Sequence, residues 1–142
     1  MTRNRKTAKD AGTRFETAIA GYLAKHVANH IERRTRNGTK DRGDISGLWH
    51  MSRRIVMEIK DYGGKILVGK WLGEVEIERG NDDAGVGVVV AKRYNNVKPG
   101  EQLVIMTVDD LICLLTGSRP DELGEAIVTV PDVSDPWAEV KP

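Results

Sequence analysis

The spacing of apolar residues near the start of the chain predicts a long amphipathic helix. Between residues 8 and 29, the positions Phe15, Ile19, Tyr22, Leu23 and Val27 recur at the i, i+4, i+7, i+8 intervals of one helical face. A helix over this stretch has about five turns.

Two segments with strand-like patterns follow. Asp44 heads a short strand over residues 44–48, and a turn at about 50–53 leads into a second strand over 54–60. Along the second strand, apolar residues alternate with Val56, Glu58 and Lys60. One face of this strand is therefore apolar, and the other carries a carboxylate and an amine.

A second helix is expected over residues 70–80, where the residues near one face are Trp71, Leu72, Val75 and Glu78. Gly73 weakens this helix, because glycine costs stability in a helix interior.

The remaining pattern completes a sheet. The valine-rich run over residues 85–92 predicts a strand buried on both faces, and a further short strand is expected over 101–106. A helix over 108–116 follows, with Thr107 as its N-cap and Gly117 as its stop. The order of elements predicts an α/β domain with a mixed sheet flanked by helices. We expect this domain to span residues 1–117, including a basic N-terminal tail, and an acidic, proline-containing tail to span 118–142.

The composition excludes several classes of protein. The chain has 142 residues, 39% of them hydrophobic and 30% charged, which suits one globular domain. No apolar run approaches the ~20 residues needed to cross a bilayer, so no membrane partner is expected. The N-terminal residues lack the apolar stretch of a secretory signal, and the single cysteine forms no internal disulfide or zinc cluster. We therefore expect a cytoplasmic protein, in the host cytoplasm if it is phage-encoded.

The net charge of +1 conceals an uneven distribution. Residues 1–60 carry 14 Lys and Arg against 6 Asp and Glu, whereas residues 61–142 carry 8 against 15. A basic half of this density suits a polyanion such as DNA or RNA, because each neutralised phosphate releases a counterion. Much of the charge lies in one short polar stretch, which contains Arg33, Arg34, Arg36, Lys40 and Arg42. Taken alone, such a stretch is equally typical of a solvated surface.

Four residues beside this stretch form a candidate catalytic set, namely Glu16, Asp44, Glu58 and Lys60. Residues i and i+2 of a strand point the same way, so Glu58 and Lys60 share a face, and Asp44 converges with them if its strand pairs with theirs. Two carboxylates and the carbonyl of Ile59 would offer the oxygen ligands that Mg²⁺ prefers. Lys60 would orient a water or offset transition-state charge, and Glu16 would position a metal or water from the helix. Separately, each residue also fits an ordinary surface or turn position.

The combination resembles the PD-(D/E)XK nuclease superfamily and, within it, the archaeal-type Holliday junction resolvases with their phage-encoded relatives. The matching features are a helix glutamate, a basic loop, Gly43-Asp44 and a Glu-X-Lys strand 14 residues after the aspartate. Gly43 stands where the superfamily name expects proline. The resemblance implies a restriction-endonuclease-like fold for the nuclease domain over 1–117 and a Mg²⁺ site at Asp44, Glu58 and Ile59 in which Mn²⁺ substitutes.

By this resemblance, the chain is expected to be a structure-selective DNA endonuclease that resolves four-way junctions by paired hydrolytic nicks. A homodimer is expected, because the junction has two-fold symmetry and needs two cuts. Thr39 matches the small hydroxyl residue of the resolvase loop. The expected DNA contacts are Arg33, Arg34, Arg36, Thr39, Lys40, Arg42 and Lys70.

Three other functions share parts of this pattern. A nuclease of the same fold acting on flaps, ends or duplex DNA fits the same residues. A noncatalytic DNA-binding module of the same fold is a further alternative; its signature would be a missing carboxylate or lysine, and all four candidate residues are present. A nucleotide cofactor is not expected, because Trp71 follows Gly69-Lys70 where a phosphate-binding loop needs Ser or Thr.

Overall fold

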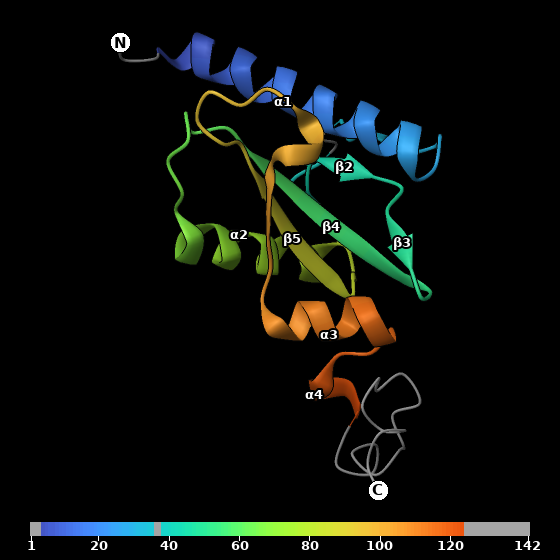
Figure 1. The fold of residues 1–142 in the computed structure, drawn as a ribbon. Helices are drawn as coiled ribbons and strands as arrows, with labels where there is room; N and C mark the ends of the chain where they lie inside the picture. Colours follow the sequence, from blue (N-terminus) through green and yellow to red (C-terminus); the bar gives the residue numbers. More distant parts are fainter. Residues whose placement is uncertain (1–3, 36–37, 124–142) are drawn as a thin grey trace, which may run out of the picture.

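A mixed sheet of six strands forms the centre of the molecule (Figure 1). The structure is a computed structural model, and it describes residues 4–35 and 38–123. The strands are β1 (Glu32–Arg33), β2 (Ile45–Ser46), β3 (Trp49–His50), β4 (Arg53–Lys60), β5 (Val86–Ala91) and β6 (Leu103–Ile105). The helices are α1 (Arg5–His26), α2 (Val68–Asn81), the 3-10 turn η1 (Pro99–Glu101), α3 (Val108–Thr116) and α4 (Pro120–Leu123). The predicted α/β class with a mixed, helix-flanked sheet is confirmed, and this architecture is consistent with a restriction-endonuclease-like fold.

Strand β4 is the central strand of the sheet. It runs parallel to β5 over its C-terminal three quarters, from the pair Ile55 and Val86 to the pair Lys60 and Ala91. The other pairings are antiparallel, and the strand order is β1-β2-β4-β5-β6 with β3 paired to β4 beside that path. The parallel connection between β4 and β5 contains α2, as crossovers between parallel strands usually contain a helix.

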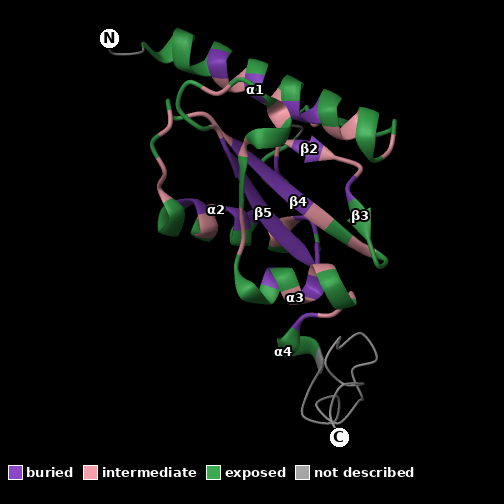
Figure 2. Cartoon of the chain, viewed as in Figure 1, coloured by how far each residue is buried: buried purple, intermediate pink, exposed green. Residues whose placement is uncertain are grey.

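The two faces of the sheet bury separate apolar clusters. On one face, Phe15 and Ile19 of α1 and Cys113 of α3 pack with the side chains of Met57 and Ile59. On the other face, α2 packs its buried residues against Val56, Val89 and Ala91. Helices α1 and α2 therefore lie on opposite sides of the sheet (Figure 1), and β5 is buried along its whole length (Figure 2).

Several predicted elements are confirmed. The valine-rich strand is buried at every position, and α3 begins after Thr107, whose hydroxyl accepts a hydrogen bond from the amide of Asp110. Gly117 ends α3 in the left-handed conformation.

Other expectations need correction. Residues 44–48 do not form one strand, because β2 ends at Ser46 and the chain turns through Gly47 before β3 begins at Trp49. The first helix ends at His26, and Val27 is exposed as its C-cap, so the predicted apolar face does not extend that far. Tyr22 is also 40% exposed. Strand β1 was not predicted, since its two residues are both charged and exposed.

Part of the predicted C-terminal tail lies within the described residues. It contains α4, and the guanidinium of Arg119 just before it is buried against the carboxylate of Asp110 at 2.7 Å. Residues 124–142 lie outside the described part. None of the helices in residues 4–35 and 38–123 has the length and hydropathy that a membrane-crossing helix needs.

Candidate metal-binding site

The pairing of β2 with β4 places Asp44 beside Glu58. Ile45 faces Met57 in this antiparallel pair, so Asp44, which directly precedes β2, and Glu58 of β4 are neighbours. The amide of Asp44 donates to the carbonyl of Met57 at 2.9 Å, and Asp44 Oδ2 accepts from the amide of Ile59 at 2.7 Å. The predicted convergence of the two carboxylates is therefore present.

Gly43 permits this approach. Its φ is +88°, and a Cβ atom there would lie 2.9 Å from Cγ1 of Val56 and 3.1 Å from the carbonyl oxygen of Met57. A side chain would both strain the backbone and push the loop away from β4. Glycine at the position before Asp44 is thus required by the local geometry, whereas proline would be incompatible with the positive φ.

The alternation of β4 sends Glu58 toward α2, where it meets two further acids. Carboxylate oxygens of Asp41, Glu58 and Glu78 all lie within 4.8 Å of one another, and we call these three residues the carboxylate cluster. Glu58 is 9% exposed and Glu78 only 5%. The Oε2 atoms of both glutamates are buried without a hydrogen-bond partner among the described residues. This cluster could hold a metal ion, because its carboxylate oxygens lie close together and are of the kind that hard divalent cations bind.

The environment raises the pKa values of the acids at this site. Burial, followed by the negative charge of Glu58, raises the pKa of Asp44 to about 8. Burial, followed by the adjacent carboxyl of Glu78, raises the pKa of Glu58 to about 8. Burial likewise raises the pKa of Glu78 to about 7. Burial and mutual repulsion therefore disfavour the ionised forms of these carboxyls, and a bound cation would stabilise them.

Lys60 brings a positive charge to the same face. Its Nζ lies 3.4 Å from Oε1 of Glu58 and 2.7 Å from Oε2 of Glu74 on α2. Burial by itself lowers the pKa of Lys60, but the hydrogen bond to Glu74 and the charge of Glu58 outweigh it and raise the pKa above its ordinary value. Lys60 is therefore a cation at neutral pH.

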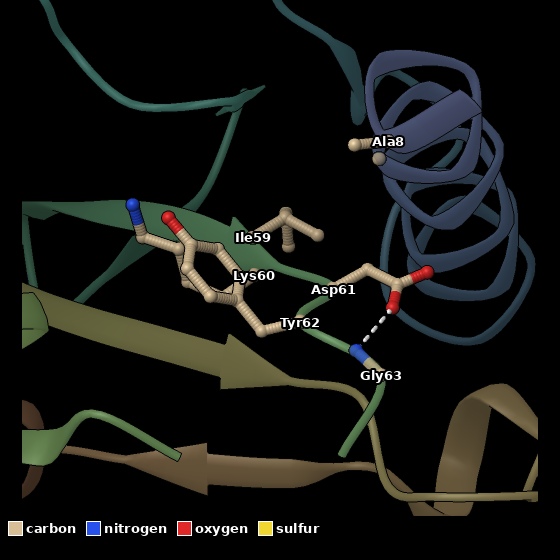
Figure 3. A pocket seen from close by; sticks show the side chains of 7 residues that line it. Ala8, Ile59, Lys60, Asp61, Tyr62 and Gly63 are labelled. Carbon is tan, nitrogen blue, oxygen red and sulfur yellow. Dashed lines mark hydrogen bonds between the residues drawn. The ribbon is translucent and has the colours of Figure 1, made fainter. Parts of the chain in front are cut away.

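An open cleft of about 590 Å³ reaches the end of β4. It is lined by Ile59, Lys60 and the loop that follows, with Ala8 and Gly12 of α1 on the far side. Figure 3 shows the side chains of Lys60 and Tyr62 on one side of this loop and Asp61 turned toward α1, where Asp61 accepts from the amide of Gly63 at 3.1 Å. The predicted metal ligand Ile59 therefore lies in the wall of this cleft, across from small residues of α1.

Glu16 occupies a different position from the other three predicted catalytic residues. It lies on α1, which covers the sheet face opposite to α2. Its Oε2 forms an ion pair with Nε of Arg33 at 2.7 Å, although its charge is near enough to contribute to the raised pKa of Asp44. Glu16 is thus at the margin of the site and is held by a basic residue of the predicted DNA-binding stretch.

The predicted DNA-contact residues are mostly on the surface. Thr39, Lys40, Arg42 and Lys70 are exposed, and Arg33 is exposed beside Glu16. Arg34 is half-buried, with Nη2 3.5 Å from Oδ2 of Asp82. Arg36 lies outside the described residues. The basic stretch therefore runs beside Asp44, to which Arg34 is joined by a hydrogen bond of 2.7 Å from its amide to the carbonyl of Asp44.

Sequence reasoning missed Asp41 and Glu78 as members of the site. Glu78 carried a signal, because it falls on the apolar face of α2 with Trp71 and Val75, where an acid needs a partner. Asp41 is the one acid in the basic stretch over residues 33–42. Its sequence position does not show that it reaches the cluster.

No family model matches the chain, and no curated protein or solved structure matches it either.

Proposed function

We propose that this chain is a Mg²⁺-dependent, structure-selective DNA endonuclease that hydrolyses phosphodiester bonds of branched DNA, with the four-way junction as its first expected substrate. The observation that carries the proposal is the meeting of buried carboxylates with a lysine at the end of β4. Lys60 Nζ lies 3.4 Å from Oε1 of Glu58, and Asp44 Oδ2 accepts from the amide of Ile59, which lies between Glu58 and Lys60 on β4. The resemblance to junction resolvases supports the choice of substrate.

The donor set fits a hard divalent cation. All side-chain ligands that the site offers are carboxylate oxygens, which Mg²⁺ and Mn²⁺ prefer. Glu58 belongs to two groups of acids. It pairs with Asp44 as a predicted metal ligand, and it is a member of the carboxylate cluster. When bound, the ion would polarise the phosphodiester and lower the pKa of a coordinated water.

The residues of the chain supply positioning and charge. The amide of Ile59 donates to Oδ2 of Asp44 and so fixes this side chain. The other carboxylate oxygen of Asp44 is therefore held in one orientation. Lys60 is held between Glu58 and Glu74, where its ammonium group can balance the negative charge that develops on phosphate during hydrolysis. Arginine contacts to phosphate position a strand without reading its sequence, and Arg33, Arg34 and Arg42 lie beside Asp44 for that role.

The decisive experiment is a cleavage assay on end-labelled DNA with Mg²⁺. A four-way junction, a flap and a linear duplex of matching sequence are compared for the wild-type chain and for Glu58→Gln and Asp44→Asn. We expect paired, symmetric nicks in the junction for the wild type and none for either variant. Both variants should still bind the junction, because they keep the shape of the site and the basic surface.

The matched control is Glu76→Gln. Glu76 is a solvent-facing glutamate of α2 that pairs with Arg79 outside the cluster, so its variant should cut at the wild-type rate. Cleavage of all three substrates would leave a nuclease of broader selectivity. Cleavage by Glu58→Gln at the wild-type rate would refute the assignment of the site, and binding without cleavage by the wild type would indicate a noncatalytic DNA-binding module.

A further inference from the structure

The hairpin of β3 and β4 presents an aromatic ring at the surface. The strands are joined by a two-residue turn in which Met51 and Ser52 both have positive φ, at 52° and 63°. This turn geometry matches the twist of paired strands and fixes Trp49 directly opposite Arg54. Cζ of Arg54 lies 5.0 Å from the centroid of the Trp49 ring, and Trp49 remains 56% exposed. The arginine therefore supports the indole while much of it stays open to solvent.

A cavity of about 250 Å³ opens beside this ring and is strongly basic. Trp49, Arg34, Arg42 and Arg54 line it, and Asp82 is the one acid among its described lining residues. The Asp82 carboxylate is shared by Arg34 at 3.5 Å and Arg54 at 3.4 Å, so the walls keep a net positive charge. Nε of Arg34 is buried with no hydrogen-bond partner in the described part of the chain. An unmatched buried donor in a basic pocket favours an anion as the missing partner.

The pocket faces the same way as the carboxylate cluster. Arg54 and Glu58 are four residues apart on β4, so their side chains share a face and are separated by roughly 13 Å along the strand. That distance is about four base steps of a DNA strand at 3.4 Å each. Asp82, at the C-cap of α2, follows the cluster residue Glu78 by one helical turn. A strand whose phosphate lies at the cluster can therefore reach the pocket with a nucleotide a few steps further along.

We propose that this pocket binds an unpaired nucleotide of the DNA substrate, with its base stacked on Trp49 and its phosphate held by Arg34 and Arg42. The inference rests on the proposed function and adds to it a reason for structure selectivity. A base can stack on an exposed indole only when it is free of its own base pair, and such stacking tolerates any base. The pocket would therefore favour DNA with a splayed strand at the branch point over fully paired duplex.

The test is a binding measurement in EDTA, in which metal-dependent cleavage does not contribute. Fluorescence anisotropy compares a labelled duplex with the same duplex ending in two splayed arms. Wild type should prefer the splayed DNA, and Trp49→Ala should bind it about 5- to 100-fold more weakly, the loss expected for one stacked base. Duplex binding should change little. Trp49→Phe, which keeps a ring, should retain the preference.

Met51→Ala is the matched control, because Met51 is an exposed apolar residue of the same hairpin that does not line the pocket. An unchanged affinity of Trp49→Ala for splayed DNA, or an equal loss on both DNAs, would overturn the inference. If Trp49→Ala does not fold, quenching of tryptophan fluorescence by oligo-dT decides the matter. Quenching in wild type that is lost in Trp49→Phe supports the pocket, and equal quenching in both contradicts it.

The two proposals fail in different ways. A preference for splayed DNA that depends on Trp49, together with no cleavage in Mg²⁺, would support the pocket proposal and refute the nuclease proposal. Metal-dependent cleavage, together with binding that does not depend on Trp49, would support the nuclease proposal and refute the pocket proposal.

Discussion

Binding of a divalent cation at the site is expected to expel protons, and their number follows from the acids involved. The pKa values are about 8 for Asp44, about 8 for Glu58 and about 7 for Glu78. At pH 7 these three carboxyls together hold on the order of one to two protons, because they titrate as a coupled group. A cation binds carboxylates in their ionised form, so these protons must leave when it binds.

The sign of the pH dependence is fixed by the same values. Protons oppose the cation below the raised pKa values, so metal affinity should rise with pH between about 6 and 9. At pH 9 the three carboxyls are almost fully ionised, and fewer than about 0.5 protons should be released. Calorimetric titration with Mn²⁺ in two buffers of different ionisation enthalpy measures this number directly, as the slope of the observed enthalpy against the buffer's ionisation enthalpy.

Asp44→Asn provides an internal check, because it removes one of the acids that titrate. The number released at pH 7 should then fall by about one. Glu76→Gln, which changes an exposed acid of α2, should leave it unchanged. Titrations that show no proton release at pH 7, or the same release at pH 7 and pH 9, would refute the reasoning from buried carboxyls.

Two further predictions test the construction of the site. Glu78→Gln should weaken Mn²⁺ binding at least about tenfold in the same calorimetric titration, since it removes a carboxylate of the cluster, and affinity equal to wild type would exclude Glu78 as a ligand. Gly43→Ala should destabilise the fold by about 1–3 kcal/mol in urea unfolding, because φ is +88° and the new Cβ would lie 2.9 Å from Cγ1 of Val56. Gly73→Ala, in the interior of α2 with nothing within 4 Å of its Cβ, should instead be neutral or stabilising, and equal effects at both glycines would contradict the steric argument.

Local periodicity accounts for what could be read from the sequence. A period of two placed Glu58 and Lys60 on one face of a strand, and an uninterrupted valine run marked β5 as buried on both sides. Thr107 and Gly117 marked the ends of α3 because capping depends on a few adjacent residues. These features need no knowledge of distant contacts.

The failures lie where local pattern carries little information. The two charged residues of β1 have no strand-like alternation, and they form a strand only because β2 lies beside them. Val27 follows the apolar spacing of α1 but lies beyond its last residue, so it has nothing to pack against and stays exposed.

The sequence by itself determined the class of fold, the strand that carries Glu58 and Lys60, and the basic stretch before Asp44. Only the tertiary structure decided that Asp41 and Glu78 join Glu58, that Glu16 pairs with Arg33, and that Trp49 closes a pocket of arginines. The physical reason is the distance along the chain over which each effect acts. Periodicity and capping act within a few residues, whereas these contacts join side chains that are brought together by loops and by packing across the two faces of the sheet.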